Sequence, residues 1–166
     1  MAYSDHLTGL PNRRKFVECL QQSIYTSERT GKITALMVLD CDKLKQINDT
    51  FGHDIGDEVI KEFAKRVRSS LRKMDTLSRV GGDEFTVVLP ELSSEQDAAA
   101  ISNRIFGAVR KPMYIKGKKL QITASIGVSF YPANTGNMEE LFKEADIALY
   151  KAKESGRNKC CFNWKK

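Results

Sequence analysis

The sequence predicts an α/β fold of the α+β sandwich type, in which helices flank a central, mainly antiparallel sheet. Apolar residues at helical spacing alternate with short apolar runs that are typical of strands. A Gly-Gly pair between two such runs indicates a hairpin, and hence antiparallel neighbours. The 166 residues, with 41% hydrophobic and 29% charged content, fit one globular domain spanning residues 1–166.

The first third of the chain predicts a helix, a strand and a second helix. The first helix follows Pro11 and ends at Gly31, a plausible glycine stop. Its apolar face comprises Phe16, Leu20 and Ile24. The run TALMVLD, residues 34–40, has the composition of a buried strand and ends at Asp40. After a polar stretch, the second helix carries an apolar face of Val59, Ile60, Phe63, Val67 and Leu71.

A hairpin is predicted next. The runs LSRV, residues 77–80, and FTVVLP, residues 85–90, flank Gly81 and Gly82. A two-residue Gly-Gly connection predicts a type I′ turn, because that turn needs positive φ at both central residues. Asp83 and Glu84 are therefore expected at or just beyond a tight turn.

The rest of the chain predicts two helices and two strands. Ser93 with Gln96 resembles a capping box ahead of a third helix. Its apolar face comprises Ala98, Ile101, Ile105 and Val109. Residues 121–130 then alternate between apolar and polar or small side chains, which predicts a strand covered on one face. A last helix is expected over about residues 137–154, and CCFNW, residues 160–164, predicts a short final strand.

Composition narrows the functional classes. No apolar run approaches the roughly 18 residues of a membrane span, and the N-terminus lacks a secretory signal, so we expect a cytoplasmic domain excised from a larger protein. The four cysteines form no metal or disulfide pattern and are expected to be reduced. The net charge of +6 favours phosphate ligands on a nucleotide, a nucleic acid or an acidic membrane. The absence of an aromatic-basic stripe weakens the nucleic-acid interpretation.

The acids near the glycine pair have two interpretations. Asp40 ends one strand, and Asp83 and Glu84 follow the turn of another, so pairing of these strands would bring three carboxylates together. Carboxylate oxygens are suitable ligands for Mg²⁺. The alternative is that they are solvated turn residues, which is the commoner fate of acids beside glycine. Taken alone, the turn favours this second interpretation.

Four motifs together resemble the catalytic domain of diguanylate cyclases, the GGDEF family. They are DHLTGLPNRR, INDTFGHDIGD, RVGGDEF and ADIALYKAKESGRN, and they occur in family order from Asp5 to Asn158. The resemblance implies a nucleotidyl cyclase-like palm fold and the condensation of two GTP molecules into cyclic di-GMP with release of two pyrophosphates. The usual phenylalanine before Lys45 is replaced here by Leu44, which affects local packing and no catalytic position.

The resemblance also implies roles at the glycine turn. Two Mg²⁺ ions, or Mn²⁺ in their place, are expected in each active site. The implied ligands are Asp40, Asp83 and the backbone carbonyl of Cys41. Glu84 would bind metal or accept the proton of the attacking 3′-hydroxyl. Gly81 and Gly82 would let the backbone approach the nucleotide closely.

Substrate contacts are implied in two other motifs. Asn48 and Asp57 would read guanine, and a carboxylate can accept hydrogen bonds from both N1 and N2 of that base. Lys45, Lys153 and Arg157 would contact phosphates. From the residues alone, Asp57 is also typical of a helix start, Asn48 of a turn, and cations at a helix C-terminus complement the helix dipole.

An inhibitory site for the product is implied by Arg72 and Asp75, an R-x-x-D motif followed by five residues and then Gly81. A guanidinium fork suits the O6 and N7 edge of guanine. Arg104 would supply a second contact, and the ligand would be an intercalated cyclic di-GMP dimer. The alternative is a basic helix C-terminus before an Asp turn.

The resemblance places one GTP in each domain, so two domains must meet face to face and a homodimer is expected. Regulatory domains are expected in the full-length protein, and no nucleic acid or direct membrane insertion. Asp5 and Arg13 are expected to form a structural ion pair. A catalytically silent module that binds GTP or senses cyclic di-GMP remains the alternative function.

Overall fold

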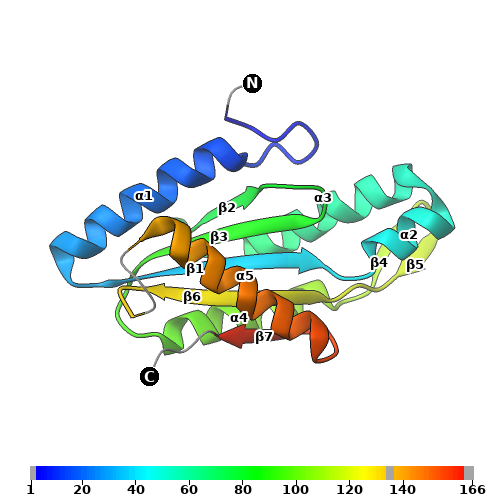
Figure 1. Ribbon diagram of the computed structural model, residues 1–166. Helices are drawn as coiled ribbons and strands as arrows, with labels where there is room; N and C mark the ends of the chain where they lie inside the picture. Colours follow the sequence, from blue (N-terminus) through cyan, green and yellow to red (C-terminus); the bar gives the residue numbers. More distant parts are fainter. Residues whose placement is uncertain (1–2, 134–136, 163–166) are drawn as a thin grey trace.

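The computed structural model describes residues 3–133 and 137–162. Helices and strands are interspersed along the chain (Figure 1). The helices are α1 (Arg13–Thr30), α2 (Leu44–Phe51), α3 (His53–Ser69), α4 (Gln96–Val109) and α5 (Met138–Glu154). The strands are β1 (Ile33–Cys41), β2 (Thr76–Arg79), β3 (Glu84–Leu92), β4 (Met113–Ile115), β5 (Lys118–Leu120), β6 (Ala124–Tyr131) and β7 (Lys159–Phe162).

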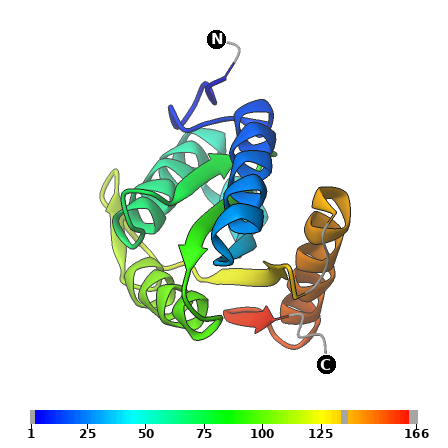
Figure 2. The same cartoon turned by 90° about the vertical axis from the view of Figure 1, so that its left-hand side faces the viewer.

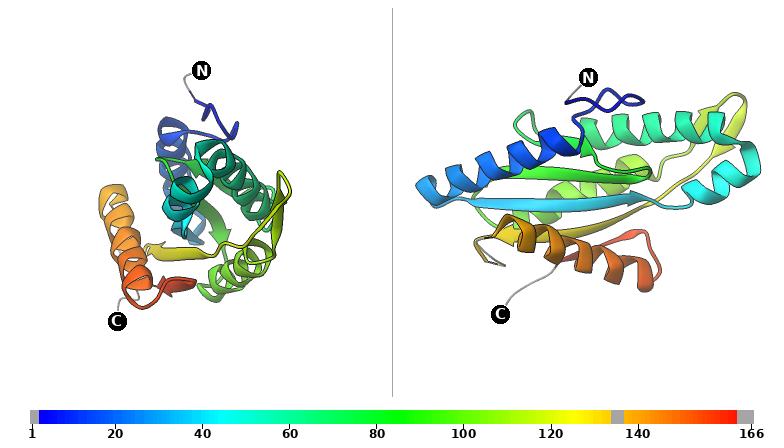
Figure 3. Two further views of the ribbon diagram at one scale, coloured as in Figure 1. Left: turned by 90° about the vertical axis from the view of Figure 1, so that its right-hand side faces the viewer. Right: turned by 45° about the horizontal axis from the view of Figure 1, so that its top comes forward.

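A five-stranded sheet in the order β2-β3-β1-β6-β7 forms the centre of the domain. Every neighbouring pair is antiparallel except β6 with β7, which run parallel. The predicted fold class, a mainly antiparallel sheet flanked by helices, is confirmed. A separate two-stranded ribbon, β4-β5, extends from the domain beside α2 (Figure 3).

Helices cover both faces of the sheet, and each face has its own hydrophobic core (Figure 2). Leu36 and Val38 of β1 pack with residues of α1 and α5. Met37 and Leu39 point the other way and pack with residues of α3 and α4. This alternation is the ordinary period of two of a strand. It also places Asp40, which follows the parity of Val38, on the α1 and α5 face.

The prediction for the 121–130 strand is wrong in one respect. Every residue of β6 is buried, so the strand is covered on both faces. Ser125 and Ser129 lie on this strand and satisfy their hydroxyls through hydrogen bonds to Asp42 and to the backbone oxygen of Leu141. The polar positions in this alternating pattern are therefore buried serines with hydrogen-bond partners, and they do not indicate a solvent-exposed face.

Gly127, in the middle of β6, decides how closely α5 approaches the sheet. A Cβ atom built at this position would lie 2.2 Å from the backbone oxygen of Ala145 and 2.2 Å from the backbone nitrogen of Leu149. The helix backbone therefore lies directly on the strand, which only glycine permits. This contact fixes the depth of α5 and, with it, the side chains at its C-terminal end.

Two local predictions are wrong in detail. The hairpin between β2 and β3 forms, but its loop comprises residues 80–83 and neither Gly81 nor Gly82 has positive φ, so the turn is not type I′. The capping box at Ser93 is also absent. Helix α4 begins after Glu95, and the backbone N–H of Ser94 donates to the carboxylate of Asp97 instead.

Two elements were not predicted: helix α2 and the β4-β5 ribbon. Leu44 and Ile47 of α2 are buried in the core, so the replacement of phenylalanine by Leu44 is accommodated. Gly52 separates α2 from α3 with φ of 92°, a conformation that favours glycine. Helix α3 ends at Ser69, two residues before Leu71, which still packs against the core.

The final strand, β7, ends at Phe162, so residues 163–164 of the predicted CCFNW strand lie outside the described residues. Cys19, Cys41, Cys160 and Cys161 are free thiols, as predicted. Within the described ranges, no helix has both the length and the hydropathy needed to cross a membrane.

Candidate active site

Three structural ends meet at one end of the sheet: the C-terminal end of β1, the β2-β3 loop and the C-terminal end of α5 (Figures 1 and 3). Asp40 of β1 pairs directly with Glu84 of β3 in the antiparallel register. Directly opposed residues place their side chains on the same face of a sheet. The two carboxylates therefore share the face that α5 covers, as the sequence predicted from the pairing of these strands.

The carboxylate of Asp40 is buried, and only one of its two oxygen atoms has a partner among the described residues. Its Oδ2 atom forms an ion pair with Lys153 of α5. Its Oδ1 atom is buried without a hydrogen-bond partner in the described structure. Burial raises the pKa of Asp40, the carboxylates of Asp83 and Asp42 raise it further, and the lysine opposes the shift. An uncompensated carboxylate oxygen beside other acids is a position suited to a cation.

Glu84 belongs to the same electrostatic cluster. Burial raises its pKa, with contributions from the nearby carboxylates of Asp146 and Asp40, while Lys153 and Arg13 oppose them. Asp146, on α5, also has a raised pKa because of burial, opposed by the same two cations. The sequence analysis missed Asp146. Its spacing of seven residues from Lys153, two helical turns, would have placed both side chains on one face of the helix.

Arg13 has a different environment from the predicted one. The expected Asp5–Arg13 ion pair is wrong, because Asp5 pairs with Arg79 at 3.2 Å. The guanidinium of Arg13 lies 5.5 Å from the ring centroid of Phe142 on α5. From there its charge opposes the rise in the pKa of both Glu84 and Asp146 that burial causes. Arg13 is thus part of the cluster of charges around the acids.

The β2-β3 loop carries Asp83 at its end, exposed to solvent. The backbone N–H of Cys41 donates to the carbonyl of Asp83 at 3.3 Å, which joins the loop to the end of β1. Arg79 donates twice to the carbonyl of Gly82, at 2.7 and 3.1 Å. A Cβ atom at Gly82 would meet nothing within 4 Å, so the space above this residue is open.

A cavity of about 310 Å³ lies between this loop and the α2-α3 pair. It is lined by Leu44, Lys45, Asn48, His53, Gly56, Asp57, Ile60, Arg79, Gly82 and Asp83. The structure therefore brings together three predicted substrate-binding residues and two residues of the predicted catalytic loop. A second cavity of about 410 Å³ shares Arg79 and Gly82 with the first and adds Arg13 and Arg14.

Gly56 controls the orientation of Asn48 in the first cavity. A Cβ atom at Gly56 would lie 1.6 Å from the Oδ1 atom of Asn48. The amide of Asn48 thus occupies the space that any other residue at position 56 would fill. Glycine costs helix stability in the interior of α3, so the site gains an oriented amide at a local cost.

Lys153 and Arg157 lie at and just beyond the C-terminal end of α5, as predicted. Lys153 contacts Asp40, and Arg157 lies 3.7 Å from Asp42, a buried acid that the sequence analysis did not single out. Lys153 and Arg157 do not line either of the two cavities described above. The cations instead approach the acid cluster from the α5 side.

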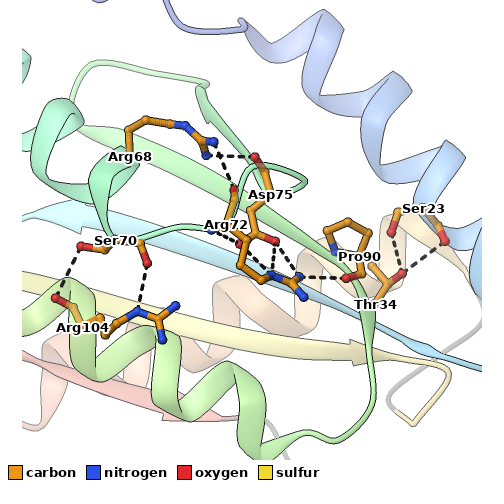
Figure 4. Close-up of polar contacts among 8 residues, drawn as sticks. All are labelled: Ser23, Thr34, Arg68, Ser70, Arg72, Asp75, Pro90 and Arg104. Atoms are coloured by element: carbon orange, nitrogen blue, oxygen red, sulfur yellow. Dashed lines mark hydrogen bonds and ion pairs between the residues drawn. The ribbon is translucent and has the colours of Figure 1, made fainter.

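The R-x-x-D residues form a compact motif at the far end of the β2-β3 hairpin (Figure 4). Arg72 donates through Nε and Nη2 to the carboxylate of Asp75 and through Nη2 to the carbonyl of Pro90. Arg104 on α4 reaches the same segment by donating to the carbonyl of Ser70 at 3.3 Å. Pro90 is six residues along β3 from Glu84, so the two sites are separated by about 20 Å.

A metal ion bound by Asp40 and Asp83 would need further ligands from groups other than acidic, histidine or cysteine side chains. Among the described residues, no three Asp, Glu, His or Cys side chains form a metal-binding group. The carboxylate of Asp83 nevertheless contributes to the raised pKa of Asp40, and the Oδ1 atom of Asp40, which has no hydrogen-bond partner among the described residues, fits a cation.

The fold defines a mixed α/β domain in which helices flank a central, mainly antiparallel five-stranded sheet. The family model described as diguanylate cyclase, GGDEF domain, matches residues 2–159. The chain belongs to the GGDEF family. Among solved structures it is similar to the GGDEF domain of TpbB from Pseudomonas aeruginosa, with a TM-score of 0.95, 34% identity, and coverage of 97% of this chain and 94% of that chain.

Curated relatives differ in their named activities. Diguanylate cyclase DgcP of Pseudomonas aeruginosa is 41% identical, over 95% of this chain and 23% of the relative. Response regulator PleD of Caulobacter vibrioides is 40% identical, over 95% of this chain and 35% of the relative. The cyclic di-GMP phosphodiesterase NbdA of Pseudomonas aeruginosa is 43% identical, over 98% of this chain and 21% of the relative. The chain thus spans about a fifth to a third of the length of these three relatives.

One further structure shows what a similar domain binds. The GGDEF domain of DgcB from Caulobacter crescentus was solved in complex with c-di-GMP. It matches with a TM-score of 0.89 and 30% identity, covering 98% of this chain and 96% of that chain.

Proposed function

We propose that this domain is a diguanylate cyclase, which condenses two GTP molecules into cyclic di-GMP and releases two pyrophosphates. The cavity between the β2-β3 loop and the α2-α3 pair carries the proposal. It places Asn48 and Asp57, from two different helices, in the same lining as Asp83. Base-reading side chains and a metal-binding carboxylate in the lining of one cavity are what a nucleoside triphosphate site requires.

Asp57 and Asn48 would recognise guanine. Asp57 is exposed to the cavity, and a carboxylate there can accept from both N1–H and N2–H of guanine, which adenine cannot match. Lys45 in the same lining would contact phosphate. The remaining phosphate contacts would come from Lys153 and Arg157 at the end of α5.

Asp40, Asp83 and the backbone carbonyl of Cys41 would hold two Mg²⁺ ions, with phosphate oxygens and water completing the ligand shells. When bound, these ions neutralise the triphosphate and lower the pKa of the attacking 3′-hydroxyl. Lys153 orients Asp40 through their ion pair. Glu84, whose pKa is raised by burial and by neighbouring acids, would bind metal or accept a proton from the hydroxyl.

Catalysis would need a homodimer, because each domain supplies one of the two GTP molecules. The domain would act as one part of a longer protein, in the cytoplasm, under the control of a regulatory partner or domain. Two comparisons support this context. The chain covers only a limited share of the length of its relatives. The diguanylate cyclase SiaD of Pseudomonas aeruginosa was solved with its activator SiaC; it is 42% identical, over 96% of this chain and 61% of that chain, with a TM-score of 0.89.

Incubation of the purified domain with GTP and Mg²⁺ tests the proposal. We expect chromatography to detect cyclic di-GMP and pyrophosphate, at a rate that rises faster than linearly with protein concentration. The Asp83→Ala variant should give no product, because it lacks a metal ligand. Absence of product from the native domain at high concentration, with its fold intact, would contradict the proposal.

Gly56→Ala should raise the KM for GTP about tenfold with little change in the free energy of unfolding. The new Cβ atom would displace only the side-chain amide of Asn48, so the fold adapts while the base loses a contact. Steady-state kinetics and urea unfolding measure both effects. The matched control is Gly107→Ala in α4, where a Cβ atom meets nothing within 4 Å. An unchanged KM in Gly56→Ala would remove Asn48 from base recognition.

Arg72→Ala should abolish product inhibition while turnover is retained, because the R-x-x-D motif lies about 20 Å from the acid cluster. Added cyclic di-GMP is titrated against the initial rate. Arg72→Lys should also weaken inhibition, since lysine keeps the charge but lacks the guanidinium fork. Thermal unfolding controls for the loss of the Asp75 partner. Inhibition that persists unchanged in both variants would show that the motif is structural.

The alternative function is a silent module that binds GTP or cyclic di-GMP without turnover. The similarity to NbdA, which is named a cyclic di-GMP phosphodiesterase, supports this alternative. Binding of GTP and Mg²⁺ by calorimetry, without product at any protein concentration, would favour this alternative over the cyclase.

A further inference from the structure

The buried carboxylate of Asp42 holds the turn that follows α5, and we propose that it is a positioning residue for Arg157 at the phosphate side of the active site. The inference rests on the proposed function, since it assigns Arg157 a phosphate of GTP. The acid lies two residues beyond Asp40, at the point where β1 leaves the sheet. Its side chain is 1% exposed.

Among the described residues, the polar contacts of the Asp42 carboxylate go to the start of β6 and to the turn that follows α5. On the β6 side it accepts hydrogen bonds from Thr123 Oγ1 at 2.7 Å and from Ser125 Oγ at 2.8 Å. On the α5 side its Oδ2 accepts the backbone N–H of Asn158 at 3.1 Å, and its Oδ1 lies 3.7 Å from Nη1 of Arg157. The two hydroxyls orient the acid, and the acid in turn fixes the backbone that follows α5.

The turn itself needs such support. Gly156, Arg157 and Asn158 have φ values of 113°, 62° and 50°, so three consecutive residues lie in the left-handed region. Glycine adopts this region readily and asparagine does so occasionally, whereas arginine seldom does. Backbone conformations of this kind persist where surrounding contacts hold them. The hydrogen bond from Asn158 to Asp42 is the contact that ties this turn to β1.

Asp42 holds the backbone firmly and the guanidinium loosely. The Arg157 side chain is 52% exposed, and its separation of 3.7 Å from the acid exceeds a normal hydrogen-bond length. The charged end is therefore free to turn towards a phosphate while its Cα atom stays in place. Asp40 with Lys153 repeats the arrangement two residues earlier, so an acid near the end of β1 and an acid just beyond it each engage one cation at the C-terminal end of α5.

The test is Asp42→Asn, which keeps the size of the side chain but weakens its acceptor capacity. Hydrogen exchange of residues 155–159, followed by mass spectrometry, should accelerate about tenfold while exchange in β1 and β6 stays unchanged. The KM for GTP should rise about tenfold with kcat changed much less. The control is Asp97→Asn, an exposed acid that also accepts a backbone N–H but lies on α4.

A double-variant cycle separates positioning from general structural support. If Asp42 acts through Arg157, adding Arg157→Ala to Asp42→Asn should raise KM by less than Arg157→Ala does alone. Full additivity, or unchanged exchange at residues 155–159, would overturn the inference. Should Asp42→Asn not fold, Thr123→Val takes its place, with exchange at 155–159 expected to accelerate about threefold and an unchanged rate again overturning it. The exchange readout needs no turnover, so it decides the inference even if the native domain makes no cyclic di-GMP.

Discussion

Asp40→Asn should lower the rate of cyclic di-GMP formation by roughly 1,000-fold. The substitution preserves the shape of the side chain but removes the charge that the proposed Mg²⁺ site depends on. The Oδ1 atom of Asp40, buried without a partner, is the structural basis of this expectation.

The same variant should be at least as stable as the native domain when metal is absent. Burial raises the pKa of Asp40 above its ordinary value of 3.8, so the folded state binds the proton more tightly than the unfolded state does. The charged carboxylate therefore costs stability at neutral pH, and this cost disappears as pH falls through the raised pKa. Asparagine removes the cost, and Lys153 remains partly exposed and can be hydrated.

Product chromatography and thermal unfolding in EDTA, at neutral pH and near pH 4, measure both effects. The stability difference between Asp40→Asn and the native domain should be largest at neutral pH. Asp97→Asn serves as the matched control, with activity expected near the native level. Turnover within tenfold of native in Asp40→Asn would exclude Asp40 as a metal ligand.

Gly127→Ala should destabilise the domain by about 3 kcal/mol, at the upper end of ordinary overpacking effects. The added methyl group would lie 2.2 Å from two backbone atoms of α5, and backbone cannot rotate away as a side chain can. The helix must move off the sheet or the strand must bend. Either movement also displaces Lys153 from Asp40, so activity should fall together with stability.

Urea unfolding followed by circular dichroism measures the change. Gly107→Ala is the control with the opposite sign, because alanine in an open position of a helix should stabilise by about 0.5–1 kcal/mol. A Gly127→Ala domain with native stability would mean that α5 does not lie as close to β6 as the structure places it.

Periodicity in the sequence was sufficient for most of the fold. The positions of α1, α3 and α4 follow from apolar spacing, that of β1 from its apolar composition, and the antiparallel hairpin from the runs on either side of Gly81 and Gly82. The predictions failed where a short sequence pattern is compatible with more than one local structure. A Gly-Gly pair suits type I′ turns, but the β2-β3 loop has four residues and its glycines keep ordinary φ. Helix α2 is too short for its period to be recognised.

Sequence patterns determined the elements, the family resemblance and the identity of the residues proposed for the site, because these depend on residue type and spacing along the chain. Only the tertiary structure decided which charges meet. It paired Asp5 with Arg79 instead of Arg13, added Arg13 and Asp146 to the acid cluster, and buried Asp42 beneath the turn that carries Arg157. Such contacts join residues from separate strands and helices. Their partners depend on sheet register and on the close approach of α5 to Gly127, which local spacing does not encode.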